Sequence, residues 1–260
     1  MHERHSNKRQ YFEEQYQTCK KHLLPFIEEK KAIQQDIHIL EVGCGFGGNL
    51  LPFLELGCQV TGVEILPSSI HLAKEFIPQS DWPNLTLICN NIFDCRGFNG
   101  KFDIILMKDT IEHIQDQNKL MSQMRTWLKS EGVIFQAFPP WVNPFGGHQQ
   151  MCKSRVLSRL PWLHLLPRSM YRGILALFGE NKSTINSLIH EVYDTGISSN
   201  RFFGICKRNQ YAIIHSRFYF INPHYEIKFS LKPRKLWGIF NIPIIRDFYT
   251  TTVYCLLIKI

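Results

Sequence analysis

The stretch from Ile37 to Ile65 places the strongest constraint on this 260-residue chain, because glycines stand there between two short apolar segments. An apolar run ends at Val42, a helical apolar segment continues to Leu56, and a second apolar run begins at Gln59. The glycines between them are Gly43, Gly45, Gly47 and Gly48. This order predicts a strand, a sharp turn, a helix and a second, parallel strand. Bare backbone at the turn would let a ligand approach closely.

Two acidic residues at the ends of the predicted strands favour a ligand that contains a nucleoside. Glu64 closes the second strand 21 positions after Gly43, a spacing at which a carboxylate can accept hydrogen bonds from ribose hydroxyls. Glu41 lies at the carboxyl end of the first strand, where an unpaired carboxylate would be costly. The ammonium of a methionine moiety would stabilise Glu41, whereas a pyrophosphate would be repelled by it.

A dinucleotide is the competing ligand. Gly43, Gly45 and Gly48 also satisfy the GxGxxG spacing of nicotinamide-binding domains, a pattern of low specificity when it stands alone. An NAD(P)-dependent oxidoreductase is therefore an alternative function, and the position of Glu41 argues against it.

Three segments in this order resemble motifs of the class I S-adenosylmethionine-dependent methyltransferases. The run Glu41 to Gly47, EVGCGFG, resembles their first motif. The run Asn90 to Asp94, NNIFD, resembles the motif that holds the adenine, although Asn91 stands where the family usually has Asp. The run Lys108 to Ile114, KDTIEHI, resembles the turn after the fourth strand in the quinone-biosynthesis-like branch. The resemblance implies S-adenosylmethionine as the cofactor.

The resemblance also implies the architecture. We expect an α/β, Rossmann-like, doubly wound sheet of seven strands, mostly parallel with an antiparallel last strand, and a helical insertion after strand five. The expected parts are an N-terminal helical cap at 1–35, the cofactor-binding core at 36–140, the insertion or lid at 141–198, and the C-terminal part of the sheet at 199–260.

The cofactor contacts implied by the resemblance lie in the first half of the chain. They are Glu41, Gly43, Cys44, Gly45, Gly47, Glu64, Ile65, Ser68, Asn91, Ile92 and Lys108. In methyltransferases of this type an N-terminal helix commonly covers the cofactor, so Tyr11 and Tyr16 are further candidates. The alternative for both tyrosines is simple packing of a helix onto the domain.

The insertion is the expected acceptor pocket, because ligands of an open parallel sheet bind beyond the carboxyl ends of its strands. Its aromatic content favours an apolar or partly apolar small-molecule acceptor, methylated on oxygen or carbon. Two alternatives stay open. The insertion could only complete the core, or Trp162, Leu165, Arg168 and Arg172 could contact a membrane that holds a lipid-linked acceptor.

Few catalytic groups are needed, since the positive sulfur of the cofactor is already a good leaving group and positioning supplies much of the rate. A base is required only for a protonated acceptor. His148, on the loop after the fifth strand, is the first candidate base and His113 the second. For His148 the alternative is a structural role in ordering the lid. We expect no metal site, because no cluster of the catechol-methyltransferase kind is visible.

Composition adds few constraints. The formal net charge is +8, but the basic residues are mostly dispersed, so we do not expect nucleic acid as a partner. A nucleic-acid-directed methyltransferase and a non-catalytic basic binding module stay as alternatives. The polar start and the lack of an apolar run long enough to span a bilayer predict a cytoplasmic protein without a transmembrane segment. The eight cysteines form no CxxC pair, and the oligomeric state cannot be read from the sequence.

Overall fold

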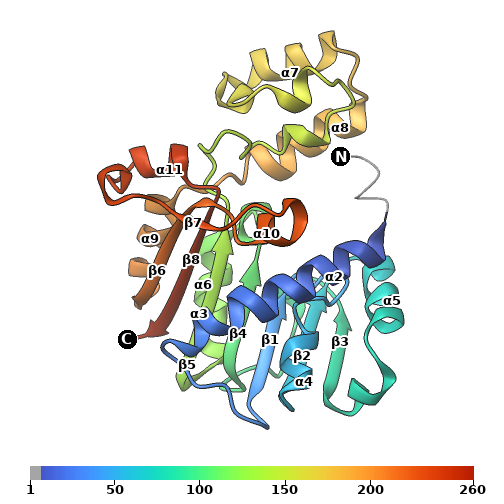
Figure 1. Cartoon of the computed structure of the whole chain (residues 1–260), viewed down its shortest axis with the longest axis vertical. Helices are drawn as coiled ribbons and strands as arrows, with labels where there is room; N and C mark the ends of the chain where they lie inside the picture. The colour runs from blue at the N-terminus through green and yellow to red at the C-terminus, as the bar shows by residue number, and fades with distance from the viewer. Residues whose placement is uncertain (1–6) are drawn as a thin grey trace.

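An eight-stranded sheet forms the centre of the molecule, with the strand order β3-β2-β1-β4-β5-β8-β6-β7 (Figure 1). The computed structural model describes residues 7–260, apart from the side chain of Glu191, so the first six residues of the expected N-terminal cap lie outside the described part. The strands are β1 (His38–Val42), β2 (Gln59–Glu64), β3 (Leu85–Cys89), β4 (Phe102–Lys108), β5 (Leu128–Phe138), β6 (Tyr211–Ile221), β7 (Arg234–Lys235) and β8 (Thr252–Lys259).

The expectation of a mostly parallel, Rossmann-like sheet with an antiparallel last strand is confirmed. β1 to β5 pair in parallel, and β8 runs antiparallel to both of its neighbours, β5 and β6. The expected count of seven strands is wrong by one. The additional strand is β7, only two residues long, which pairs with the end of β6 at the edge of the sheet.

Helices cover both faces of the sheet (Figure 1). One face packs against α6 and α9, and the other packs against α2 to α5. The α-helices are α2 (Lys8–Thr18), α3 (Leu24–Glu28), α4 (Leu51–Glu55), α5 (Pro67–Phe76), α6 (Gln117–Trp127), α7 (Arg168–Leu177), α8 (Lys182–Asn186), α9 (Ser199–Arg208), α10 (His224–Phe229) and α11 (Ile245–Tyr249). Short 3-10 and π turns connect them: η1 (Cys19–Leu23), η2 (Gln79–Asn84), η3 (Ile92–Asp94), η4 (Ile111–His113), η5 (Gln149–Met151), η6 (Leu157–Arg159), η7 (Leu163–Leu165), η8 (Ser187–Tyr193) and η9 (Gly238–Phe240).

Strand alternation decides which side chains can reach the site. In β1, Leu40 and Val42 belong to the core beneath α6 and α9, while Ile39 belongs to the core beneath α2 to α5. Because successive side chains of a strand point to opposite faces, Glu41 shares the α2 side with Ile39. Lys108, two positions after Leu106 in β4, faces the same side.

The segment after β5 packs around a small core of its own. Tyr171 and Leu175 of α7 contact Leu188 and Ile189 of η8, and all four are buried. Figure 1 shows α7 and α8 beyond the carboxyl ends of the parallel strands, where the sequence predicts a lid. The exact boundaries at residues 141 and 198 stay a prediction.

Within residues 7–260, no helix combines the length and apolar character needed to cross a bilayer.

The N-terminal helix depends on a glycine for its close contact with the domain. A Cβ on Gly48 would lie 2.5 Å from the backbone oxygen of Phe12 in α2 and 2.7 Å from Cβ of Gln15. Real Cβ atoms do not approach a backbone oxygen this closely, and that oxygen cannot move without shifting the helix. Gly48 is therefore required for the position of α2.

We expect Gly48→Ala to lower the free energy of unfolding by about 1 to 3 kcal/mol, because the added methyl group forces α2 outward. Urea unfolding would measure this. Gly204→Ala in α9 is the matched control, since its Cβ would make only an ordinary contact, 3.5 Å from the Arg208 side chain. Alanine there should leave stability unchanged or raise it by up to about 1 kcal/mol. An unchanged Gly48→Ala would show that α2 does not pack as described.

Candidate active site

The glycine turn lies between the carboxyl ends of β1 and β4. The backbone nitrogen of Gly43 donates to the oxygen of Val63 at 2.9 Å, which fixes the turn to β2. Gly43 has a φ of +73°, and a Cβ on it would lie 2.7 Å from Oγ1 of Thr110. Only glycine satisfies both the left-handed backbone and the contact with the segment after β4.

Glu64 ties the turn to the start of α5. Its Oε2 accepts from the backbone nitrogen of Gly45 at 3.1 Å, and its Oε1 accepts from the nitrogen of Leu66 at 3.0 Å. Each carboxylate oxygen can accept more than one hydrogen bond, so Glu64 retains capacity for the ribose hydroxyls that the sequence predicts as its partners.

A pocket opens beside this turn, where α2, the turn, α5 and β4 meet. It is lined by Tyr11, Gln15, Gly43, Gly45, Phe46, Ser69, Lys108 and Asp109. Four predicted cofactor residues are thus brought together: Tyr11, Gly43, Gly45 and Lys108. Gln15 was missed by sequence reasoning, although it follows Tyr11 by one helical turn, a spacing that puts both on one face of α2.

Glu41 is almost completely buried next to this pocket. Its Oε1 accepts from Nδ2 of Asn49 at 2.7 Å, while Oε2 has no hydrogen-bond partner among the described residues. Burial raises the pKa of Glu41 to about 8, against the opposing effects of the Asn49 hydrogen bond and of Lys108. A buried carboxyl group with one free oxygen fits a cationic partner, which would supply the missing interaction.

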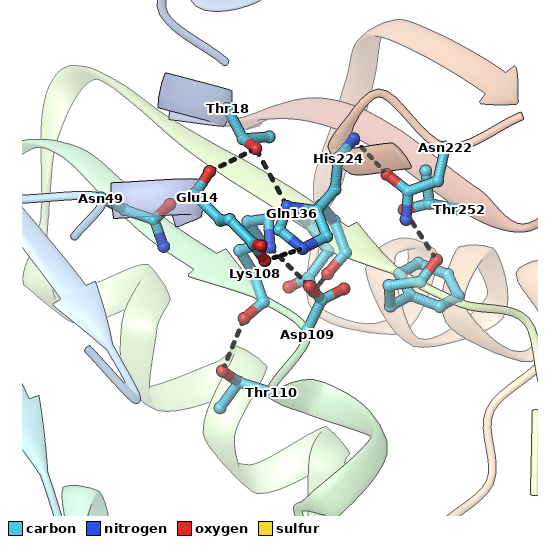
Figure 2. Close-up of polar contacts among 12 residues, drawn as sticks. Glu14, Thr18, Asn49, Lys108, Asp109, Thr110, Gln136, Asn222, His224 and Thr252 are labelled. Carbon is cyan, nitrogen blue, oxygen red and sulfur yellow. Dashed lines mark hydrogen bonds and ion pairs between the residues drawn. The ribbon is translucent and has the colours of Figure 1, made fainter. Parts of the chain in front are cut away.

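Lys108 and Asp109 form an ion pair at the pocket, with 2.6 Å between Nζ and Oδ2 (Figure 2). Burial opposes the charge of Lys108, but the Asp109 carboxylate outweighs this and raises the lysine pKa. Burial likewise disfavours ionised Asp109, and Lys108 outweighs it, so the pKa of Asp109 is lowered. Both groups are therefore charged near neutral pH. Lys108 lines the pocket, and its ammonium is already paired with the carboxylate of Asp109.

Two predicted cofactor residues direct their side chains elsewhere. The hydroxyl of Tyr16 donates to Oε1 of Glu55 in α4 at 2.7 Å, so the expected contact with the cofactor is replaced by a surface contact. Cys44 is buried, and its Sγ lies against Gly62 in β2, where an added Cβ would be only 2.8 Å away. At the turn, Cys44 can offer only its backbone to a ligand.

The remaining predicted residues lie outside the lining of this pocket. Ile65 and Ser68 are exposed after β2, and Ile92, the first residue of η3, is buried. Asn91 is exposed, and its Oδ1 accepts from the backbone nitrogen of Phe93 at 3.0 Å, which caps η3. Gly47, with a φ of +82°, shapes the turn itself. Contacts of these residues with a cofactor stay predictions.

The two predicted bases lie side by side. The ring centroids of His113 and His148 are 5.2 Å apart. His148 has a left-handed backbone with a φ of +53°. Burial, and after it the neighbouring His113, lower the pKa of His148 to about 4. His148 is therefore a neutral imidazole near pH 7, able to accept a proton only when the product cation is stabilised by its surroundings.

Glu112 joins these histidines in a group that the sequence did not predict. Potential ligand atoms of Glu112, His113 and His148 all lie within 4.8 Å of one another. Both carboxylate oxygens of Glu112 are buried and lack a hydrogen-bond partner among the described residues, and burial raises its pKa well above the ordinary value. Two imidazoles and one carboxylate are a donor set for a divalent ion such as Zn²⁺. This donor set was not identified from the sequence, and the expectation of no metal site stays a prediction.

A third histidine reaches the site from the C-terminal part of the chain. Nδ1 of His224 in α10 lies 2.9 Å from Oγ1 of Thr18, and its Nε2 lies 3.9 Å from Glu14 (Figure 2). Burial and then Lys108 lower the pKa of His224 to about 3, so this ring is neutral. No motif or spacing in the sequence could have identified it, because α10 comes to α2 only through the fold.

The comparisons with known proteins agree with this geometry. Residues 40–136 match a family model described as a methyltransferase domain. The sequence is 37% identical over 103 residues to a ubiquinone biosynthesis O-methyltransferase of Bartonella quintana, covering 39% of this chain and 40% of that protein. Residues 40–136, which carry the glycine turn, are thus identified as a methyltransferase domain of the S-adenosylmethionine-dependent kind. The chain aligns with only about two fifths of the length of the Bartonella protein.

Two further comparisons are a sequence similarity to another methyltransferase and a similarity of fold to a solved structure. A sterol 4-C-methyltransferase of Caenorhabditis elegans is 27% identical over 109 residues, covering 41% of this chain and 32% of that protein. The solved geranyl diphosphate C-methyltransferase of Streptomyces coelicolor A3(2) has a TM-score of 0.58 at 14% identity, over 91% of this chain and 78% of that one. These comparisons give no support to an oxidoreductase or to a nucleic-acid-directed enzyme.

We expect the stability of this protein to depend on pH through Glu41. The folded-state pKa of about 8 exceeds the ordinary value of 4.5, so the folded protein keeps a proton that the unfolded chain releases. The contribution is fully present below pH 4.5 and is lost as the pH rises towards 8. Relative to the wild type, Glu41→Gln should gain about 1.4 kcal/mol per pH unit in this window.

Urea unfolding of both proteins at several pH values measures this difference directly. Comparison with the variant cancels the contributions of Glu112 and of the buried histidines, which titrate in both proteins. A difference that does not change between pH 5 and 8 would contradict the burial of an uncharged Glu41.

Proposed function

We propose that this chain transfers the methyl group of S-adenosylmethionine to an oxygen or carbon atom of a small, partly apolar molecule. The observation that carries the proposal is the buried free oxygen of Glu41 beside a bare glycine turn that Glu64 closes on the other side. An ammonium at Glu41 and ribose hydroxyls at Glu64 would satisfy both acids. A dinucleotide would bring phosphate charge towards Glu41 instead.

The residues of the site fit this cofactor. Glu41 would bind the amino group of the methionine moiety, Glu64 would bind the ribose, and Tyr11 and Gln15 would cover the ligand from α2. When bound, S-adenosylmethionine supplies a methyl group on a positively charged sulfur. The chain itself has to exclude water, to orient the acceptor and, for a hydroxyl or an acidic carbon, to remove one proton.

The loop after β5 is the proposed acceptor side. It is held rigidly, since Nε2 of Gln149 donates to the oxygens of Pro144 and Leu160, at 2.9 and 3.2 Å. His148 stands at this loop within electrostatic reach of Asp109, which lines the cofactor pocket. We infer that neutral His148 accepts the acceptor's proton and that Asp109 stabilises the resulting imidazolium.

The apolar nature of the acceptor is inferred from two sources. The names of similar proteins mention ubiquinone biosynthesis and geranyl diphosphate, and both ubiquinone and geranyl diphosphate combine polar groups with apolar carbon atoms. In this chain, Trp141 and Tyr193 pack edge to face at 5.3 Å between the loop and the insertion, an aromatic surface suited to such a molecule. A lipid-linked acceptor is a narrower form of the same proposal.

Titration with S-adenosylhomocysteine and with NADH separates the proposal from its main alternative. We expect saturable binding of the thioether by calorimetry and none of NADH. Glu41→Gln should weaken binding of the thioether by about tenfold or more, because a buried charge-assisted hydrogen bond is lost. Binding of NADH without the thioether would overturn the assignment.

His148→Asn tests the role of the loop histidine. Asparagine is chosen because it tolerates the left-handed backbone at this position, where the φ is +53°. With a hydroxyl acceptor found by screening cell extracts, we expect turnover to fall by about a hundredfold or more while binding of S-adenosylhomocysteine is unchanged. Unchanged turnover would assign His148 to ordering the loop only.

A further inference from the structure

The chain from Leu231, just before β7, to Ile245, the first residue of α11, exposes more large apolar side chains than a free surface normally does. Within residues 231–245 the exposed ones are Leu231, Trp237, Ile239, Ile242, Ile244 and Ile245. Trp237, Ile239 and Ile244 are each about two-thirds exposed or more, at 67%, 72% and 68%. Single exposed apolar residues are ordinary, but a dense group of this kind marks a contact surface. We refer to it as the 231–245 surface.

Positive charge accompanies these apolar side chains. Lys232, Arg234 and Lys235 are exposed in the same segment. From Lys228 to Arg246 the sequence contains no aspartate or glutamate. The 231–245 surface therefore presents isoleucine, leucine and tryptophan side chains together with cations only, within a chain of net charge +8.

The segment is fixed at both ends, so its exposed side chains are presented by an anchored loop. The backbone nitrogen of Leu236 donates to the oxygen of Phe218 in β6 at 2.8 Å. At the other end, Nε of Arg246 donates to Oγ of Ser199 at 3.1 Å, and the Arg246 guanidinium stacks 4.5 Å from the ring of Phe218. Buried Asp247 accepts from the backbone nitrogen of Ser199 at 2.8 Å.

Figure 1 places α11 and the loop before it at the same end of the sheet as the insertion, beyond the carboxyl ends of the parallel strands. The insertion has a similar surface there. Leu177 and Phe178 at the end of α7 are 82% and 46% exposed, and Arg168 and Arg172 lie on the same helix. Two separate segments thus expose apolar and cationic side chains at one end of the molecule.

We propose that the 231–245 surface docks this protein onto an anionic lipid bilayer. Tryptophan and isoleucine enter the interfacial region, while lysine and arginine bind lipid phosphates, the pairing found in proteins that lie on membranes. A protein partner fits less well, since lysine is depleted in protein interfaces, whereas it is abundant here. The absence of acidic residues from the segment gives charge complementarity to anionic lipid and repulsion towards a second copy of the same surface.

The docking surface is independent of methyl transfer, because none of its residues lines the cofactor pocket. It extends to the C-terminal segment the membrane contact that the sequence suggested only for the insertion. Docking of this end would bring the acceptor side towards the bilayer.

Co-sedimentation with lipid vesicles tests the proposal. The wild-type chain should bind vesicles of equal parts phosphatidylglycerol and phosphatidylcholine, bind pure phosphatidylcholine vesicles at least tenfold more weakly, and dissociate progressively as salt is raised. Ile239→Ser/Ile244→Ser should weaken binding to the anionic vesicles by tenfold or more. Lys232→Gln/Arg234→Gln/Lys235→Gln should weaken it on the order of a hundredfold, at about one kcal/mol per cation.

Ile260→Ser is the matched control, because Ile260 is 75% exposed at the other end of the sheet, and it should bind vesicles as the wild type does. Circular dichroism and S-adenosylhomocysteine binding should be unchanged in every variant, which separates this test from that of the proposed function. Two results would overturn the proposal. The first is that the wild-type protein does not bind anionic vesicles. The second is that sedimentation equilibrium shows a wild-type dimer, that Ile239→Ser/Ile244→Ser abolishes this dimer, and that the wild type does not bind vesicles.

Discussion

The meeting of three segments at one bare stretch of backbone is the constraint on which the site depends. Gly43 accommodates Thr110 from the segment after β4, Gly48 accommodates the carbonyl of Phe12 from α2, and Gly47 accommodates Ile77. Any side chain there would push α2, α5 or the β4 segment away from the turn. The glycines therefore shape the ligand crevice in two ways. Left-handed backbone conformations form the turn, and the missing side chains let the neighbouring segments pack closely against it.

Burial divides the ionisable groups of the site into charged and neutral ones. Lys108 and Asp109 stay charged because they pair at 2.6 Å. Among the residues that the structure describes, Glu41 and Glu112 have no cationic partner at such a distance, and burial raises the pKa of each. The site thus contains protonated acids that become favourable carboxylates when a cation arrives. A ligand with an ammonium and a sulfonium supplies that charge, which explains why acids are tolerated in a buried crevice.

The proposed acceptor side is built from parts that are close only in the folded chain. Buried His164 of the insertion hydrogen-bonds through Nε2 to the oxygen of Trp141 at 2.7 Å, and a Cβ on Gly147 would collide with the His164 ring. The insertion thereby fixes the loop that presents His148 beside Glu112. If the 231–245 surface rests on a bilayer, this arrangement faces the phase in which an apolar acceptor dissolves.

The sequence by itself determined what short-range rules encode: the parallel strands, the glycine turn, and the acids at the ends of β1 and β2. Strand burial, glycine conformation and the spacing of a βαβ unit act over a few residues, so Gly43, Glu41 and Glu64 were found without coordinates. The direction of Tyr16, the meeting of Glu112 with His148, and the approach of His224 to Thr18 were decided by tertiary structure. Those contacts join residues up to 206 positions apart. Which residues meet depends on how whole helices and strands pack, and a local sequence pattern carries no information about that packing.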